Sequence, residues 1–130
     1  MDMSASYKPV LMLAFLDSEN SRGRARMTDV VTRFREFYEE RGRQGVIIER
    51  ETMRMARVAE MTDDEVQNVI VSMPLRKFQQ RRYLEYARDV AWLKFNEELW
   101  KRLTDIDLLH VRQLCKDSID RYYARLTSTC

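Results

Sequence analysis

The chain has 130 residues, of which 45% are hydrophobic and 34% are charged. This composition suits one globular domain and excludes a disordered chain, which would lack the apolar groups that offset its ordering entropy. Three glycines and two prolines are too few for a linker-rich sequence and favour helices. The net charge of +2 gives no overall electrostatic argument for a nucleic-acid partner, but the charges are unevenly placed: residues 22–57 and 76–88 are basic, and residues 58–75 are acidic.

The chain carries no pattern that predicts a disulfide framework, a secretory signal or a membrane span. Its two cysteines, Cys115 and Cys130, form no CxxC pair. The longest N-terminal apolar run, residues 10–16, is far shorter than the ~20 residues of a membrane helix and follows an acidic Asp2. We therefore expect reduced thiols and a soluble cytoplasmic protein, unless the chain is cut from a larger one.

The first half of the sequence predicts two main helices. Pro9, after the possible cap Ser6, marks a helix start, and residues 10–16 are apolar on every face, which is typical of a central helix. Residues 18–26 are predicted to form a loop. A second, amphipathic helix starts at Thr28 and ends near Gly42 and Gly45. Residues 46–48 suit a strand or an extended link, and residues 52–58 a loose helix.

The second half predicts helices around a β-hairpin. Thr62 and Glu65 match a capping box, which predicts a helix start at this point. Pro74 is predicted to end this helix. Residues 75–82 are predicted to be a basic connector. Two aromatic-rich runs, 83–87 and 91–95, flank a short polar stretch, as in a hairpin. Asn96 and Thr104 are placed to cap a short helix and a long final helix.

This order of elements predicts a mainly α fold with one β-hairpin at residues 83–95. It is that of a winged helix-turn-helix-like single domain, residues 1–130, with an extra C-terminal helix. The hairpin would be the wing and residues 62–73 the recognition helix. The stretch 42–61 is longer than the minimal form of this fold contains. The predicted core contains Val10, Leu13, Ala14, Phe34, Val69, Ile70, Trp92 and Leu99.

Five segments also carry a family resemblance: residues 6–16, 34–41, 45–49, 72–78 and 95–100. In this order they resemble an accessory domain found in bacterial DEAD/DEAH-type helicases and in restriction or defence-type proteins. The resemblance spans residues 6–126. It implies a helicase-linked or stand-alone accessory piece without the helicase motor, and it assigns no activity of its own.

The residues supply no recognisable catalytic chemistry. Neither GxxxxGK(S/T) nor GxGxxG occurs, and the single histidine, His110, has no cysteine cluster beside it. The acid-x-Lys pattern of restriction-type nucleases fails because Trp92 stands two places before Lys94. The acids Glu49 and Glu51 are interpreted as a solvated face. We therefore predict no enzyme activity, no metal and no cofactor.

Two functions stay open. The first is weak, sequence-independent binding of a nucleic-acid backbone, alongside a helicase or nuclease partner, because arginine and lysine contact phosphates without reading bases. The acids of residues 62–73 oppose insertion of that helix into the major groove. The second is protein docking or dimerisation without nucleic acid; pairing of the basic residues with the acids of 58–65 would favour it. Hairpin aromatics are expected to pack inward rather than stack on bases. The predicted nucleic-acid-binding residues are Arg76, Lys77, Arg81, Arg82 and Arg88.

Overall fold

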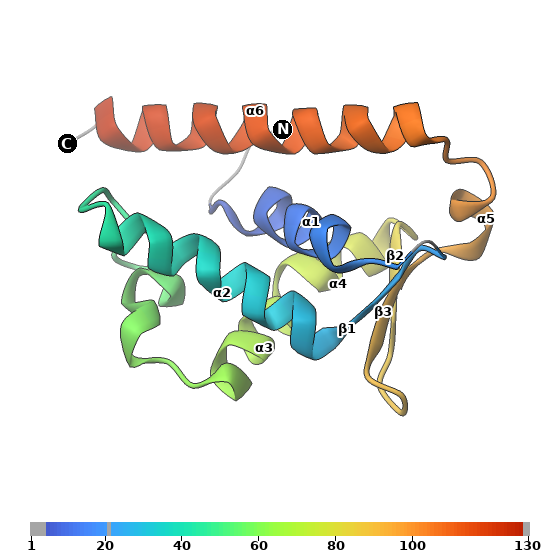
Figure 1. The fold of residues 1–130 in the computed structure, drawn as a ribbon. Coiled ribbons are helices and arrows are strands. Elements are labelled where there is room, and N and C mark those ends of the chain that lie inside the picture. The colour runs from blue at the N-terminus through green and yellow to red at the C-terminus, as the bar shows by residue number, and fades with distance from the viewer. Residues whose placement is uncertain (1–4, 21, 129–130) are drawn as a thin grey trace.

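The computed structural model describes residues 5–20 and 22–128. It is mainly helical, as the sequence predicts, and the long helix α6 lies across the central helix α1, with a small sheet at one end (Figure 1). Of the helices in the described ranges, none is both long and apolar enough to cross a bilayer. The elements are α1 (Tyr7–Ser18), β1 (Arg24–Arg26), α2 (Met27–Arg43), the 3-10 helix η1 (Arg54–Glu60), α3 (Asp63–Ser72), α4 (Pro74–Gln80), β2 (Leu84–Ala87), β3 (Trp92–Phe95), α5 (Glu97–Trp100) and α6 (Asp105–Ser128).

The core surrounds α1, which is packed against α2, α4 and α6. This agrees with its sequence, since a helix that is apolar on every face needs neighbours on all sides. Most of the predicted core residues are buried, and Leu13 and Leu99 are partly buried against the same cluster. Trp92 is the exception: it is half-buried and lies outside that cluster. The core assignment of Trp92 is therefore wrong.

The sheet has three antiparallel strands in the order β1-β3-β2. The hairpin β2–β3 confirms the prediction for residues 83–95, with Leu84 opposite Phe95 and Ala87 opposite Trp92. Strand β1 lies in the stretch that we predicted as a loop, and it pairs with the far side of β3. Its three residues contain no run of strand-forming side chains, so only the pairing partner reveals it.

Residues 44–61 follow the predicted elements, whereas residues 74–80 depart from them. Gly45 follows the end of α2 with a φ of 72°, a left-handed conformation that glycine adopts without strain. Of the two alternatives for residues 46–48, the structure has a link without a strand, and the loose helix is present as η1, two residues later than predicted. Pro74 ends α3 as predicted, but it also begins α4 where a connector was expected. Proline suits the first turn of a helix because the N–H that it lacks would have no helical partner there.

The predicted caps at three later helices are present. Thr62 and Glu65 form a reciprocal capping box at α3. Asn96 accepts hydrogen bonds from two backbone N–H groups of α5, and Thr104 accepts one from Asp107 at α6. Ser6 differs, because its side chain makes no capping bond to α1 and contacts Glu49 instead.

Candidate nucleic-acid interface

Helix α4 presents two of the predicted binding residues to solvent. Its apolar side chains Leu75 and Phe78 are buried, and the helix packs against α1 and β2. Arg76 and Lys77 occupy the opposite side and are exposed. The short basic segment is therefore an amphipathic helix whose orientation is set by two apolar anchors.

Arg81 and Arg82 lie in the turn that joins α4 to β2. Arg81 caps the C-terminus of α4, and Arg82 adopts a φ of 58°. This left-handed conformation reverses the chain, and the N–H of Tyr83 then donates to the carbonyl oxygen of Phe78 at 2.9 Å. Both arginine side chains are exposed. With the two cations of α4 they form one surface, here called the α4 cluster: Arg76, Lys77, Arg81 and Arg82.

Arg88 is exposed but separate from the α4 cluster. It stands in the turn between β2 and β3, at the far end of the hairpin from Arg82. The four residues of β2, at about 3.3 Å each, separate the two positions by roughly 13 Å of strand. The structure therefore divides the five predicted residues between the two ends of the hairpin.

The five predicted residues have no ion pair with any described residue, whereas part of the first basic block is paired with acids of α3. Within residues 5–20 and 22–128, no carboxylate lies within 4.0 Å of any of the five cationic groups. By contrast, Arg35 bonds to Asp63 at 3.1 Å and Arg54 to Glu65 at 3.2 Å. Two acids of α3, Asp63 and Glu65, are thus engaged by helix α2 and η1, and the later basic residues stay open to solvent.

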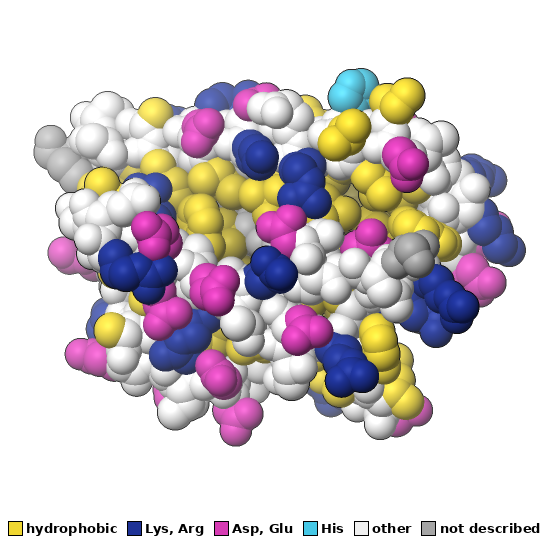
Figure 2. Space-filling view, viewed as in Figure 1, with side chains coloured by type: hydrophobic (Ala, Val, Ile, Leu, Met, Phe, Trp, Pro, Cys, Tyr) yellow, Lys and Arg dark blue, Asp and Glu magenta, His cyan; other side chains and the backbone are white. Residues whose placement is uncertain are grey.

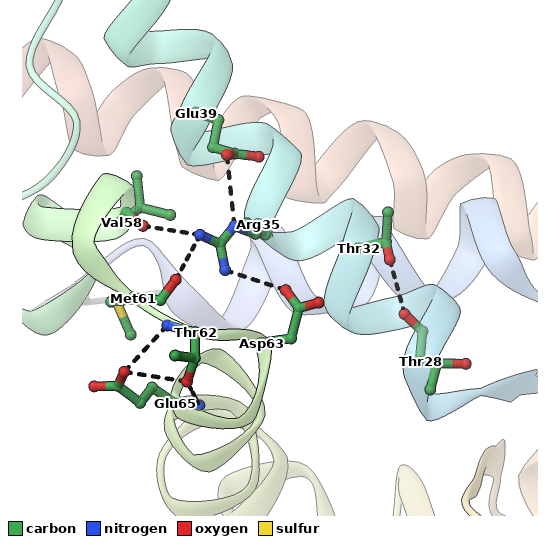
Figure 3. A network of polar contacts seen from close by, with 9 residues as sticks. All are labelled: Thr28, Thr32, Arg35, Glu39, Val58, Met61, Thr62, Asp63 and Glu65. Atoms are coloured by element: carbon green, nitrogen blue, oxygen red, sulfur yellow. Dashed lines mark hydrogen bonds and ion pairs between the residues drawn. The ribbon is translucent and has the colours of Figure 1, made fainter.

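Arg35 is a structural cation that holds the segment before α3 (Figure 3). One end of its guanidinium group donates to the carbonyl oxygens of Val58 and Met61, at 3.2 and 2.6 Å. Its other atoms contact Asp63 and Glu39. The side chain is only 19% exposed, so its charge is used within the fold. Arg35 is therefore not a candidate for phosphate binding.

A second exposed basic surface was missed by the sequence analysis. Arg24 and Arg26 are exposed on either side of the buried Ala25 in β1. The register places Arg24 beside Lys94 and Arg26 beside Trp92 in β3, and the Arg26 guanidinium lies 5.7 Å from the Trp92 ring centre. The alternation of arginine at positions 22, 24 and 26 was the available signal, because alternate residues of a strand share a face.

The hairpin aromatics are divided between core and surface. Phe95 is buried, packs edge-on against Phe15 and stacks on Trp100 at 5.5 Å between ring centres. Tyr86 is half-buried and accepts a hydrogen bond from Gln67. The expectation of inward packing holds for Phe95, whereas Tyr83 is 45% exposed.

Glu49 is not on a solvated face, as we predicted, but is buried, with 4% of its surface exposed. Its carboxylate accepts hydrogen bonds from the N–H and hydroxyl of Ser6, at 3.0 and 2.6 Å, from the N–H of Arg50 at 2.8 Å, and from the hydroxyl of Tyr122. Glu51 is exposed. In the described part of the chain, no three side chains of His, Cys, Asp or Glu cluster as metal ligands do. The Glu49 network joins the N-terminal segment, the 44–53 loop and α6.

Comparison of this chain with protein-family models, with curated proteins and with solved structures gave no match.

Proposed function

We propose that this chain is a non-catalytic accessory domain of a bacterial helicase or of a defence or DNA-processing system. In this proposal it binds the nucleic-acid backbone weakly and without sequence preference. The observation that carries the proposal is that the α4 cluster and Arg88 are exposed and lack ion pairs among the described residues, while Asp63 and Glu65 of α3 are engaged elsewhere. Unpaired surface arginines are available to neutralise phosphates.

The element order supports a winged helix as the fold behind this function. A winged helix-turn-helix has the order α1, β1, α2, α3, β2, β3 and the sheet order β1-β3-β2. In this proposal, α4 is a short extension before the wing. In such a domain, the wing and the helix before it lie nearest the nucleic acid. The helicase or defence context rests on the resemblance of residues 6–126.

The proposal is tested by a salt titration of duplex binding. Replacing Arg81 and Arg82 with Ala removes two charges, and Ala keeps the Cβ atom, so the left-handed strain at position 82 is unchanged. The slope of log affinity against log salt is about −0.9 per neutralised phosphate on duplex. The double variant should therefore flatten it by about 1–2 units on unrelated duplex sequences.

The matched control replaces Lys116 and Arg125 with Ala, because both are exposed on α6. This variant should keep the wild-type slope. Equal slopes for the wild type and the Arg81/Arg82 variant, or no binding at low salt, would contradict the proposal. Circular dichroism should show the same fold for all three proteins, since exposed charges contribute little to stability.

A second candidate function is protein docking or dimerisation. The observation in its favour is the exposed apolar surface of α6, where Ile106, Leu109 and Leu114 are 68%, 64% and 63% exposed. Large exposed apolar side chains mark interaction surfaces when they adjoin one another. Light scattering over a range of protein concentrations distinguishes the two functions, because the measured mass of a module that binds itself would rise with concentration. Such a module would also show no salt-dependent binding of nucleic acid in the titration.

A further inference from the structure

The outward face of the sheet combines cations with an aromatic ring. Residues that pair across strands have side chains on the same face. The register therefore places Arg24 and Arg26 of β1, Trp92 and Lys94 of β3, and Glu85 of β2 together. Leu93 and Phe95 alternate with them and are buried, so this set points away from the core.

The acid that the register places on this face, Glu85, is already engaged, which leaves the face basic. Glu85 lies 3.7 Å from the ammonium group of Lys94 and accepts a hydrogen bond from Asn96 at 3.0 Å. Arg24 and Arg26 have no ion pair within 4.0 Å among the described residues. In Figure 2, Lys and Arg side chains gather on the side of the molecule where Figure 1 places the sheet.

The basic face continues into a hollow beyond the end of β1. This hollow has a volume of about 270 Å³; its cationic lining comes from Arg22, Arg24 and Lys94, and the exposed acid Glu97 lines it as well. Its aromatic wall is formed by the stacked pair Phe95 and Trp100. Side chains two residues apart on a strand are separated by about 6.6 Å, which is close to the separation of neighbouring phosphates along one nucleic-acid strand. A row of basic groups therefore follows β1 from the hollow to Trp92.

We propose that the outward face of the sheet binds a single-stranded polynucleotide. Arg24 and Arg26 contact successive phosphates, and a base stacks on the Trp92 ring beside the Arg26 guanidinium. A single strand is favoured over a duplex because a base must leave its neighbours to stack on a protein ring. The inference rests on the proposed function only in taking nucleic acid as the ligand. It uses a different surface from the α4 cluster.

The first test measures the binding of short oligo(dT), oligo(U) and a duplex to the wild type and to the Arg24→Gln/Arg26→Gln variant. Two lost phosphate contacts on a single strand should flatten the salt slope by about 1.4 units. The Arg24→Lys/Arg26→Lys variant should keep the slope, because it keeps the charges. The control Lys116→Gln/Arg125→Gln should behave as the wild type. The oligo(dT) and oligo(U) arms distinguish DNA from RNA, and binding of either one supports the proposal.

The second test reads the stacking directly. The chain has two tryptophans, so the Trp100→Phe variant reports on Trp92 alone, and its fluorescence should be quenched by the single strand. The Trp92→Leu variant should lose affinity by about 5- to 150-fold, the range measured for loss of one stacked base. Circular dichroism checks the fold of both variants. An unquenched Trp92 in a complex that has formed would overturn the proposal.

The outcomes separate this inference from the proposed function. Loss of binding only in the Arg81→Ala/Arg82→Ala variant would overturn the sheet-face proposal and support the α4 cluster. Loss only in the Arg24/Arg26 variant would support the sheet face and contradict the α4 cluster. Binding of duplex but not of single strands would also overturn the inference.

The arginines of β1 have an alternative role, because charged side chains on an edge strand prevent the association of sheets. If the Arg24→Gln/Arg26→Gln variant self-associates on gel filtration while its nucleic-acid binding is unchanged, the arginines only protect the edge and the proposal fails.

Discussion

Replacement of the buried Glu49 should destabilise the fold far more than replacement of its exposed neighbour Glu51. Four donors point at the Glu49 carboxylate: two backbone N–H groups, of Ser6 and Arg50, and two hydroxyls, of Ser6 and Tyr122. Hydroxyl groups can rotate towards other acceptors, but backbone N–H groups cannot. The cost of each substitution therefore depends on how many N–H groups it leaves without an acceptor.

The Glu49→Gln variant turns one carboxylate oxygen into an amide group that donates. Since each oxygen accepts from one backbone N–H, either orientation of the amide leaves one N–H unpaired, at a cost of about 1–3 kcal/mol. The Glu49→Ala variant removes both acceptors and leaves a space, and the expected loss is about 3–5 kcal/mol. For a domain of this size that corresponds to a fall in Tm of roughly 10–20 °C.

The assay is urea unfolding followed by circular dichroism, with Glu51→Ala as the matched control. Glu51 is exposed, so its replacement should change the free energy of unfolding by no more than about 0.5 kcal/mol. Equal unfolding free energies for Glu49→Ala and Glu51→Ala would refute the reasoning, because the desolvation of the buried carboxylate would then cancel its hydrogen bonds. A changed m-value would show instead that the unfolded state had been altered.

Two further predictions concern backbone strain and pH. Gly23 and Gly45 have φ values of 73° and 72°, but a Cβ on Gly23 would lie 2.7 Å from Cδ2 of Trp100, whereas nothing lies within 4 Å of one on Gly45. Urea unfolding should therefore show a loss of about 1–2 kcal/mol for Gly45→Ala and a larger loss for Gly23→Ala. Burial raises the pKa of Tyr7 to about 12 from its ordinary value of 10. The unfolded chain releases this proton first as the pH rises above 10, so the free energy of unfolding should fall between pH 10 and 12. The Tyr7→Phe variant should lessen that slope by up to about 1.4 kcal/mol per pH unit, and an unchanged slope would contradict the assignment.

The division of charge bears on both proposed functions. Residues 22–57 contain ten arginines and six acids, whereas residues 76–88 contain five basic residues and one acid, and the sequence analysis placed all the binding residues in the second block. The structure shows that Arg35 and Arg54 serve α3, that Arg24 and Arg26 are exposed on the sheet, and that the α4 cluster lies in solvent. Two of the acids of 58–65, Asp63 and Glu65, therefore engage the first block, and the second block remains available to a ligand.

The sequence by itself determined the local elements of this protein. The capping box at Thr62, the helix end at Pro74, the hairpin and the long final helix capped by Thr104 are all present as predicted. Each depends on side chains within about four residues of one another, because helix caps, turns and hydrophobic periodicity are set by neighbours along the chain. The surface position of the α4 cluster follows from the same local pattern, with Leu75 and Phe78 as the inward anchors.

Only the tertiary structure decided the burial of Glu49, the existence of β1 and the direction of Trp92. The hydrogen-bond partners of Glu49 in the N-terminal segment and α6 lie 43 and 73 residues away. Strand β1 is defined by its pairing with β3. Successive side chains of a strand point to opposite faces, but this alternation does not determine which face meets the core. Packing of Leu93 and Phe95 against the helices settles that choice and turns Trp92 and the arginines of β1 outward.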